Sequence, residues 1–408
     1  MQGVEVAAVE SRPRFDAAGA ARGGSVYHLD PSPMCRHRRV GGMAGMIGRR
    51  VRQALSLVRN PLGTVGRAPI GPFRTLKVAL IADGLTAECL SFECHARHVT
   101  PSNYRVLLRS WRPDLLFVES AWNGYVDSWR HRIAAYPERP ASSNRDLRSV
   151  VELARSLDVP TVFWCREDGA HFDRFIESAT LFDHIFTVDE TCVPRYRAVV
   201  GDACTVETLM FAVQPDIHHS EGATYAIDRA VFMGTYCTLQ HPRRRAWQDL
   251  LFQSAAGMGV TAFDRNHRRK EAEYRFPNLP WLEVHPGVPH ARTGEIYRQY
   301  KVALNVNTVE GSGTTFSRRL IEILACGTTL VTTPAASVDR YFRDYCEVVE
   351  NLDQGSELFA RLRGEGAGGR FRERAMAGAA YVRENHTWVR RLEQVLGTIG
   401  ARRAAGGG

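Results

Sequence analysis

The segment GSGTTFSRRLIEILACGTTLVTT, residues 311–333, combines a loop of small residues with a predicted helix that begins with two arginines. The first turn of a helix presents unpaired N–H groups and the positive end of the helix dipole, so this position favours an anion. Arg318 or Arg319 can add a bidentate contact to a phosphate. Glu322 follows Arg318 by four residues, on the same helical face, and its carboxylate suits the paired hydroxyls of a ribose. The segment therefore predicts a nucleoside diphosphate site, with an i,i+4 ion pair between Arg318 and Glu322 on a solvated face as the alternative.

A second segment, MGTYCTLQHPRRRAW at 233–247, places three arginines at the start of a predicted helix, after a glycine-containing turn. Arginines at this end of a helix oppose its dipole, and an anion bound among them would explain the unfavourable placement. Gly234, Arg243 and Arg245 are therefore candidates for contact with the same diphosphate. An exposed basic turn is the alternative.

The N-terminal half offers acidic residues at the corresponding positions. The segment FVESAWNG places Glu119 at the end of a predicted strand, and FWCREDGAHFD does the same for Glu167, Asp168 and His171. The carboxyl ends of strands line the ligand crevice in open α/β sheets. An acid or a histidine there can take a proton from an attacking hydroxyl. These four residues are the catalytic candidates, with a helix cap or a solvated side chain as the alternative for each acid.

Buried strands and amphipathic helices alternate along residues 76–200 and again along 229–350, with a linker at 212–228. This alternation predicts two parallel sheets with helices on both faces. The second series includes a helix at 292–301 and a strand at 302–307, and residues 369–403 are predicted to be nearly all helical. The expected fold is α/β of the GT-B type, with two doubly wound Rossmann-like domains facing a cleft and closed by a long C-terminal helix. The predicted parts are a basic leader (1–72), an N-terminal domain (73–217), a C-terminal domain (218–375) and a helix with a tail (376–408).

The excess of basic charge lies in the leader. Residues 1–76 contain twelve arginines and four acidic residues, a net charge of +8, whereas the whole chain carries +9. This distribution argues against a nucleic-acid groove in the folded part. Residues 1–44 show no sustained period and are predicted to be disordered, and Met43 or Met46 is a candidate for the true start. Residues 46–59 predict a basic amphipathic helix in peripheral contact with an anionic membrane surface, with a solvated helix as the alternative.

The cysteine pattern and the hydropathy of the chain predict its cellular location. The nine cysteines form no C-x-x-C pair, which favours reduced thiols in a cytosol and predicts no metal site. No run approaches the roughly 20 apolar residues that span a bilayer. The predicted location is the cytoplasm, with peripheral contact at the inner face of the plasma membrane.

Several segments, taken in order, resemble the CgeB-like (spore-maturation-protein-like) glycosyltransferases, a bacterial GT-B group. They are FVESAWNG (117–124), PTVFWCREDGAHFDRFIESATLFDHIFTVD (160–189), AFDRN (262–266), NTVEGSGTTFSRRLIEILACGT (307–328) and NHTWVRRLEQVL (385–396). The resemblance implies a sugar-nucleotide donor, with a UDP-sugar favoured, in the C-terminal domain and a carbohydrate or lipid-linked acceptor at the N-terminal domain. It assigns Glu322 to the ribose. It assigns to the diphosphate or the donor sugar Ser312, Thr314, Thr315, Ser317, Arg318 and Arg319.

We therefore expect a metal-independent, hexosyltransferase-type glycosyltransferase without a cofactor, acting in the synthesis of a cell-surface or spore-layer polysaccharide or glycoconjugate. The side chains expected to offset the charge of the leaving diphosphate are Arg318, Arg319, Arg243 and Arg245. If the reaction inverts, the base is Asp168, Glu167 or Glu119, whereas a retaining reaction needs no protein nucleophile. The alternatives are a GT-B sugar-nucleotide epimerase or hydrolase, and a non-catalytic structural protein of a spore or surface layer.

Overall fold

The computed structural model describes residues 65–66, 68–139, 141–365 and 369–406. The predictions for residues 1–64, including the disordered leader and the membrane-binding helix at 46–59, lie outside the described residues. Both sheets belong to one compact unit, Gly41–Gly408. The domain boundaries expected inside this unit stay a prediction.

Six parallel strands form the first sheet, in the order β2-β1-β3-β4-β5-β6. These strands are β1 (Lys77–Ile81), β2 (His95–His98), β3 (Leu115–Glu119), β4 (Thr161–Cys165), β5 (His184–Thr187) and β6 (Thr205–Thr208). The flanking helices are α2 (Gly84–Glu93), α3 (Tyr104–Val106) with the π-helix η2 (Leu107–Trp111), α4 (Arg145–Ser156), α5 (Phe172–Ala179) and α6 (Val193–Val200). Neighbouring residues of one strand lie in different cores: Val118 packs with α4 and α5, and Phe117 packs with α2. The sheet is therefore covered on both faces, as its apolar strands predict.

The second sheet also has six parallel strands, in the order β12-β11-β10-β7-β8-β9. Its strands are β7 (Ile227–Gly234), β8 (Val260–Asp264), β9 (Leu282–Pro286), β10 (Tyr300–Asn305), β11 (Thr329–Thr332) and β12 (Glu347–Val348). Its helices are α7 (Pro242–Ser254), α8 (Thr293–Tyr297), α9 (Arg318–Ala325), α10 (Ala336–Tyr341) and α11 (Leu352–Gly364). This strand order is that of a dinucleotide-binding Rossmann sheet, which reverses between its first and fourth strands. The reversal lies between β7 and β10, so the carboxyl ends of these two strands mark the expected ligand position.

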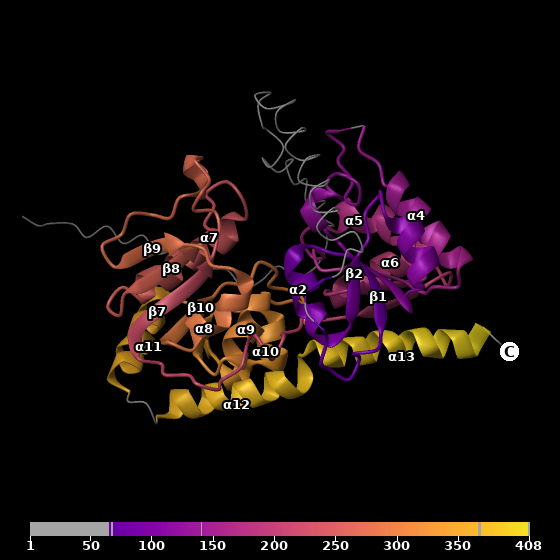
Figure 1. Cartoon of the computed structure of the whole chain (residues 1–408). Coiled ribbons are helices and arrows are strands. Elements are labelled where there is room, and N and C mark those ends of the chain that lie inside the picture. The colour runs from indigo at the N-terminus through magenta and orange to yellow at the C-terminus, as the bar shows by residue number, and fades with distance from the viewer. Residues whose placement is uncertain (1–64, 67, 140, 366–368, 407–408) are drawn as a thin grey trace, which may run out of the picture. The chain divides into compact units, whose positions relative to one another are not determined.

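The C-terminal helical region links the two sheets. It consists of two helices, α12 (Arg370–Asn385) and α13 (Trp388–Gly406), separated where Val213 N donates to the carbonyl of His386 at 2.9 Å. Val382 of α12 packs with α9 of the second sheet. Trp388 of α13 packs with Phe117 of the first sheet, and Figure 1 shows α13 running beneath that sheet. The predicted fold class, two doubly wound sheets with a long C-terminal helix, is confirmed.

Some predicted elements differ from the structure. The helix expected at 292–301 ends at Tyr297, because Tyr300 already pairs with Ile227 in the ladder between β10 and β7. The strands β2, β6 and β9 were not predicted; each lies at the edge of its sheet and carries polar residues, so it lacks the apolar run of a central strand. None of the eight cysteines that the structure describes forms a disulfide. Within the same residues, no helix is both long and apolar enough to cross a membrane.

Candidate functional site

The site predicted from residues 311–333 lies at the carboxyl ends of β7 and β10, where the strand order of the second sheet reverses. A loop from the end of β10 reaches the start of α9, and Asn307 fixes it: the amide oxygen of Asn307 accepts from Ser317 N at 3.1 Å, and its Nδ2 donates to the carbonyl of Thr333 at 3.1 Å. Ser317 is the N-cap residue of α9. The first turn of α9 therefore faces the carboxyl edge of the sheet, where its N–H groups favour an anion.

The hydroxyl groups of the small-residue loop already have protein partners. Thr314 Oγ1 and Thr315 Oγ1 donate to the carbonyl of Val188, at 2.9 and 3.0 Å, next to the end of β5. Ser312 Oγ accepts from the backbone N–H groups of Thr314 and Thr315. The loop thus joins the second sheet to the first. The expected contacts of Ser312, Thr314, Thr315 and Ser317 with a diphosphate stay a prediction.

Arg319 crosses the end of β7. Its Nε donates to the carbonyl of Met233 at 2.6 Å, and its guanidinium lies 4.5 Å from the centre of the Phe232 ring. A Cβ atom on Gly234 would lie 2.6 Å from Arg319 Nη2, so the glycine predicted for this site provides the space that the arginine needs. Arg319 Nη1 is buried and has no hydrogen-bond partner among the described residues. A buried donor without a partner is unusual in proteins, so Arg319 Nη1 is a candidate donor to a bound anion.

Arg319 belongs to a group of four neighbouring arginines, Arg244, Arg265, Arg318 and Arg319. Desolvation and the charges of Arg319 and Arg265 lower the pKa of Arg244 to about 10. Desolvation of the guanidinium and the charges of Arg319 and Arg318 likewise lower the pKa of Arg265 to about 10, although Arg265 as a whole residue is exposed. Within the described residues, Arg244, Arg265 and Arg319 form no ion pair with a carboxylate, and Arg318 pairs with Glu322. The group carries excess positive charge, which an anion would neutralise.

The structure places the three arginines at the start of α7 differently from one another. Arg243 forms an ion pair with Glu310 at 2.5 Å and its side chain is 77% exposed. Arg245 Nη1 donates to the carbonyl of Thr238 at 2.9 Å. Arg244 is the one that interacts with Arg319 and Arg265. The predicted roles of Arg243 and Arg245 remain untested predictions, and their neighbour is the better-placed candidate.

Glu322 is buried one turn into α9, with 7% of its surface exposed. Its Oε1 accepts from Arg318 Nε at 2.9 Å and lies 3.1 Å from His290 Nε2. Burial alone would raise its pKa, but Arg318 and His290 hold the pKa well below the ordinary value. The i,i+4 ion pair that was the alternative interpretation does form. It is largely buried, with 19% of the Arg318 side chain and 9% of the Glu322 side chain exposed, and so does not lie on a solvated face.

Two of the four catalytic candidates are enclosed by the first sheet. Glu119 is fully buried and forms an ion pair with Arg166; desolvation raises its pKa to about 7. Asp168 is 2% exposed and accepts from the Tyr196 hydroxyl at 3.0 Å. Desolvation raises the pKa of Asp168 to about 6. Both carboxylates are thus directed at protein partners.

The other two candidates, Glu167 and His171, are partly exposed and lie close to the second sheet. The His171 ring is 5.4 Å from that of Trp122 and 6.4 Å from that of His241, the residue before α7. Desolvation, followed by the charges of His171 and Arg244, lowers the pKa of His241. His171 and Glu167 therefore lie near His241, on which the charge of Arg244 also acts, whereas the buried Glu119 interacts with the charge of Arg318.

One set of side chains in the described residues has the composition of a metal site: His218, His290 and Glu322, whose ligand atoms lie within 4.8 Å of one another. Arg318 pairs with this carboxylate, and the charges of Arg265 and Arg319 also act on it. These positive charges oppose a metal cation and favour an anionic ligand.

Three residues of the site were missed: Arg244, Arg265 and His290. The sequence contained an indication of Arg265: this residue directly follows β8 in the segment AFDRN, and a residue in that position lies at the carboxyl edge of the sheet. No sequence pattern indicated His290, which lies in a single 3-10 turn (His290–Arg292) before α8.

The chain resembles known proteins in sequence over part of its length and in fold over most of it. Residues 252–397 match a family described as glycosyl transferase-like. The curated protein sequences contain no match. Among solved structures, Anabaena HepE in complex with UDP-glucose is 11% identical, with a TM-score of 0.50 over 80% of this chain and 91% of that chain. A glycosyltransferase from Rickettsia africae is 9% identical, with a TM-score of 0.49 over 79% of this chain and 96% of that chain. The similarity to HepE shows the fold, which is that of GT-B glycosyltransferases.

Proposed function

We propose that the protein is a glycosyltransferase that moves a sugar from a nucleoside diphosphate sugar to a hydroxyl acceptor. The observation that carries this proposal is the uncompensated arginine group beside the buried carboxylate of Glu322, at the reversal of a Rossmann sheet. A diphosphate and a ribose have the charge and the hydroxyl groups that such a pair recognises. The match to the glycosyl transferase-like family and the UDP-glucose bound by HepE support a sugar nucleotide, with a UDP-sugar favoured.

In this proposal the chemistry is mainly electrostatic. The diphosphate of the donor carries two negative charges, and breaking the bond between the sugar carbon and the phosphate oxygen adds a third. In this proposal the developing charge is stabilised by Arg244, Arg265, Arg318 and Arg319, together with the N–H groups at the start of α9. Preorganised positive groups in a partly desolvated site stabilise a transition state strongly. No metal ion is required in this scheme, and the four arginines take its place.

The acceptor would bind on the side of the first sheet, near Glu167 and His171. Desolvation lowers the pKa of His171 below its ordinary value of 6.5, so the ring is neutral at neutral pH and can accept a proton from the attacking hydroxyl. His171 and Glu167 are therefore preferred over Glu119 and Asp168 as the base of an inverting reaction. A carbohydrate or lipid-linked acceptor in cell-surface or spore-layer synthesis, and a peripheral membrane contact in the cytoplasm, complete the proposal.

Donor binding is tested by thermal shift with UDP, GDP, dTDP, CMP and ADP sugars. A ligand at 100 times its Kd stabilises the folded state by about 2.7 kcal/mol. We expect one nucleotide class to raise the melting temperature. Glu322→Ala should remove most of that rise, because it deletes the carboxylate that accepts hydrogen bonds from the ribose hydroxyl groups. A flat response to the whole panel would contradict the proposal and favour the non-catalytic alternative. Free or isomerised sugar released without an acceptor would indicate the hydrolase or epimerase.

The role of His171 is tested by the pH dependence of kcat/KM. A general base must be unprotonated, so activity falls as the pH drops through its pKa. Since the pKa of His171 is lowered, this acid limb should lie below about pH 6.5 in the wild type. We expect His171→Gln to lower kcat/KM by about 10²-fold and to abolish the limb. A variant that keeps both the rate and the limb would exclude His171 as the base.

A further inference from the structure

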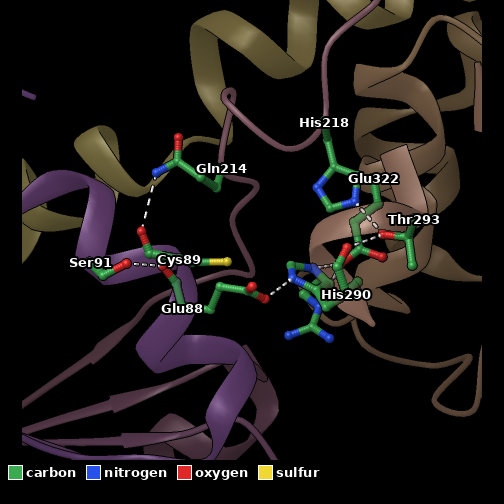
Figure 2. A network of polar contacts seen from close by, with 9 residues as sticks. Glu88, Cys89, Ser91, Gln214, His218, His290, Thr293 and Glu322 are labelled. Atoms are coloured by element: carbon green, nitrogen blue, oxygen red, sulfur yellow. Dashed lines mark hydrogen bonds and ion pairs between the residues drawn. The ribbon is translucent and has the colours of Figure 1, made fainter. Parts of the chain in front are cut away.

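The side chain of His290 lies between two carboxylates that belong to different sheets. Its Nδ1 is 3.1 Å from Glu88 Oε2 on α2, which packs on the first sheet. Its Nε2 is 3.1 Å from Glu322 Oε1 on α9, which packs on the second sheet. Figure 2 shows Glu88 reaching from α2 toward the imidazole. Both ring nitrogens are donors only in the protonated imidazolium, and in that form the ring can donate one hydrogen bond to each carboxylate at the same time.

The bridge restricts the orientation of Glu322. His290 Nε2 and Arg318 Nε approach the same oxygen, Oε1, at 3.1 and 2.9 Å. A carboxylate held on one oxygen by two groups cannot rotate freely about its last bond. The other oxygen, Oε2, has no hydrogen bond from a described residue that would have to be broken by an incoming hydroxyl. Such preorganisation lowers the entropic cost of binding a ligand.

A second chain of hydrogen bonds joins the same elements through the segment between β6 and β7. Gln214 Nε2 donates to the carbonyl of Cys89 on α2 at 3.2 Å. Four residues further on, His218 Nε2 lies 2.9 Å from Thr293 Oγ1, and the Thr293 hydroxyl donates to the carbonyl of His290 at 2.7 Å. The turn that carries His290 is therefore attached to α2 both directly and through this segment (Figure 2).

We propose that Glu88 and His290 are positioning residues for the donor nucleotide. They fix Glu322 in the orientation that receives the ribose, and they couple the donor site on the second sheet to helix α2 on the first. This inference depends on the proposed function, because Glu322 is its ribose ligand. Glu88 acts through His290, so its removal should weaken donor binding although it lies on the other sheet.

The test measures the Kd of the nucleotide identified by the thermal-shift panel, by calorimetry on the full chain, for Glu88→Ala, His290→Gln and the double variant. We expect each single variant to raise Kd by about tenfold and the double variant to raise it no further, because the two residues act in series. In steady state, KM for the donor should rise while kcat changes little. Glu88→Gln should restore part of the affinity, since its amide oxygen can still accept from Nδ1.

The chain supplies a matched control in His285, which lies 2.7 Å from Glu283 in an exposed pair. His285→Gln should leave Kd unchanged. If Glu88→Ala binds donor as the wild type does, or if the effects of the two variants simply multiply, the inference is wrong even when Glu322→Ala abolishes binding. If the wild type binds no nucleotide, the proposed function fails instead. Should His290→Gln not fold, Glu88→Ala decides the matter, because the Glu88 side chain is 37% exposed and its loss leaves no cavity in the core.

Discussion

Replacing Arg265 by glutamine is expected to lower kcat/KM for sugar transfer by about 10²- to 10³-fold, the usual effect of removing one group that stabilises transition-state charge. Arg265 follows β8 at the carboxyl edge of the second sheet, beside Arg318 and Arg319. The charge on the diphosphate grows as the sugar leaves, so the loss should appear mainly in kcat. Steady-state kinetics at saturating acceptor would measure it.

The folded state should tolerate this change, because Arg265 as a whole residue is exposed and its pKa is lowered by desolvation of the guanidinium and then by the charges of Arg319 and Arg318. Removing one of several like charges relieves the repulsion between them, so the melting temperature should stay constant or rise slightly. Arg361→Gln, on the exposed surface of α11, is the matched control and should alter neither kcat nor stability. An Arg265→Gln enzyme with the kcat of the wild type would remove the arginine group from the proposed mechanism.

The periodicity of the sequence was sufficient for the central strands and for α9. Because Arg318 and Glu322 are four residues apart on one helix, their contact follows from local geometry alone. Whether that pair faces solvent depends on His290 and on α2, which lie far away in the sequence. No local pattern contains this information, so the ion-pair and nucleotide interpretations could not be separated.

At the start of α7, the sequence likewise could not predict which of several neighbouring residues faces the site. Three consecutive arginines point in directions about 100° apart on a helix, and the helix phase selects the one that faces the site. This phase is set by the chain before α7, where His241 adopts a left-handed conformation with φ of 50°. The sequence indicated a basic helix start correctly, but it could not identify Arg244 as the residue beside Arg319.

The sequence was sufficient to place the acidic residues at strand ends, whereas it did not predict which of their side chains are buried. Glu119, Glu167, Asp168 and His171 do lie at or just beyond the carboxyl ends of β3 and β4. Tyr196 encloses Asp168, and Arg166 pairs with Glu119. These contacts come from the three-dimensional arrangement, and they turn two expected bases into interior residues.

Because Glu119 is buried, the stability of a Glu119 variant can distinguish a structural role of this residue from a catalytic one. Glu119→Ala is expected to reduce the free energy of unfolding by about 3 kcal/mol, because it leaves the buried charge of Arg166 without its closest partner. Asp83, 2.8 Å from Arg166 Nη2, compensates only part of that loss. Urea denaturation at about pH 8, above the pKa of about 7 of Glu119, measures the effect with the carboxylate ionised.

Glu167 is the internal comparison for this measurement. Its carboxylate lies 3.6 Å from Arg166 and its side chain is 23% exposed, so Glu167→Ala should cost about 1 kcal/mol or less. If Glu119 were the base, Glu119→Ala would be inactive under conditions in which it is folded, whereas Glu167→Ala would keep its activity. Because Glu119 is fully buried while Glu167 reaches the edge that faces the arginines, we expect the opposite pattern: the Glu119 variant loses stability, and the Glu167 variant loses its catalytic rate if the reaction inverts.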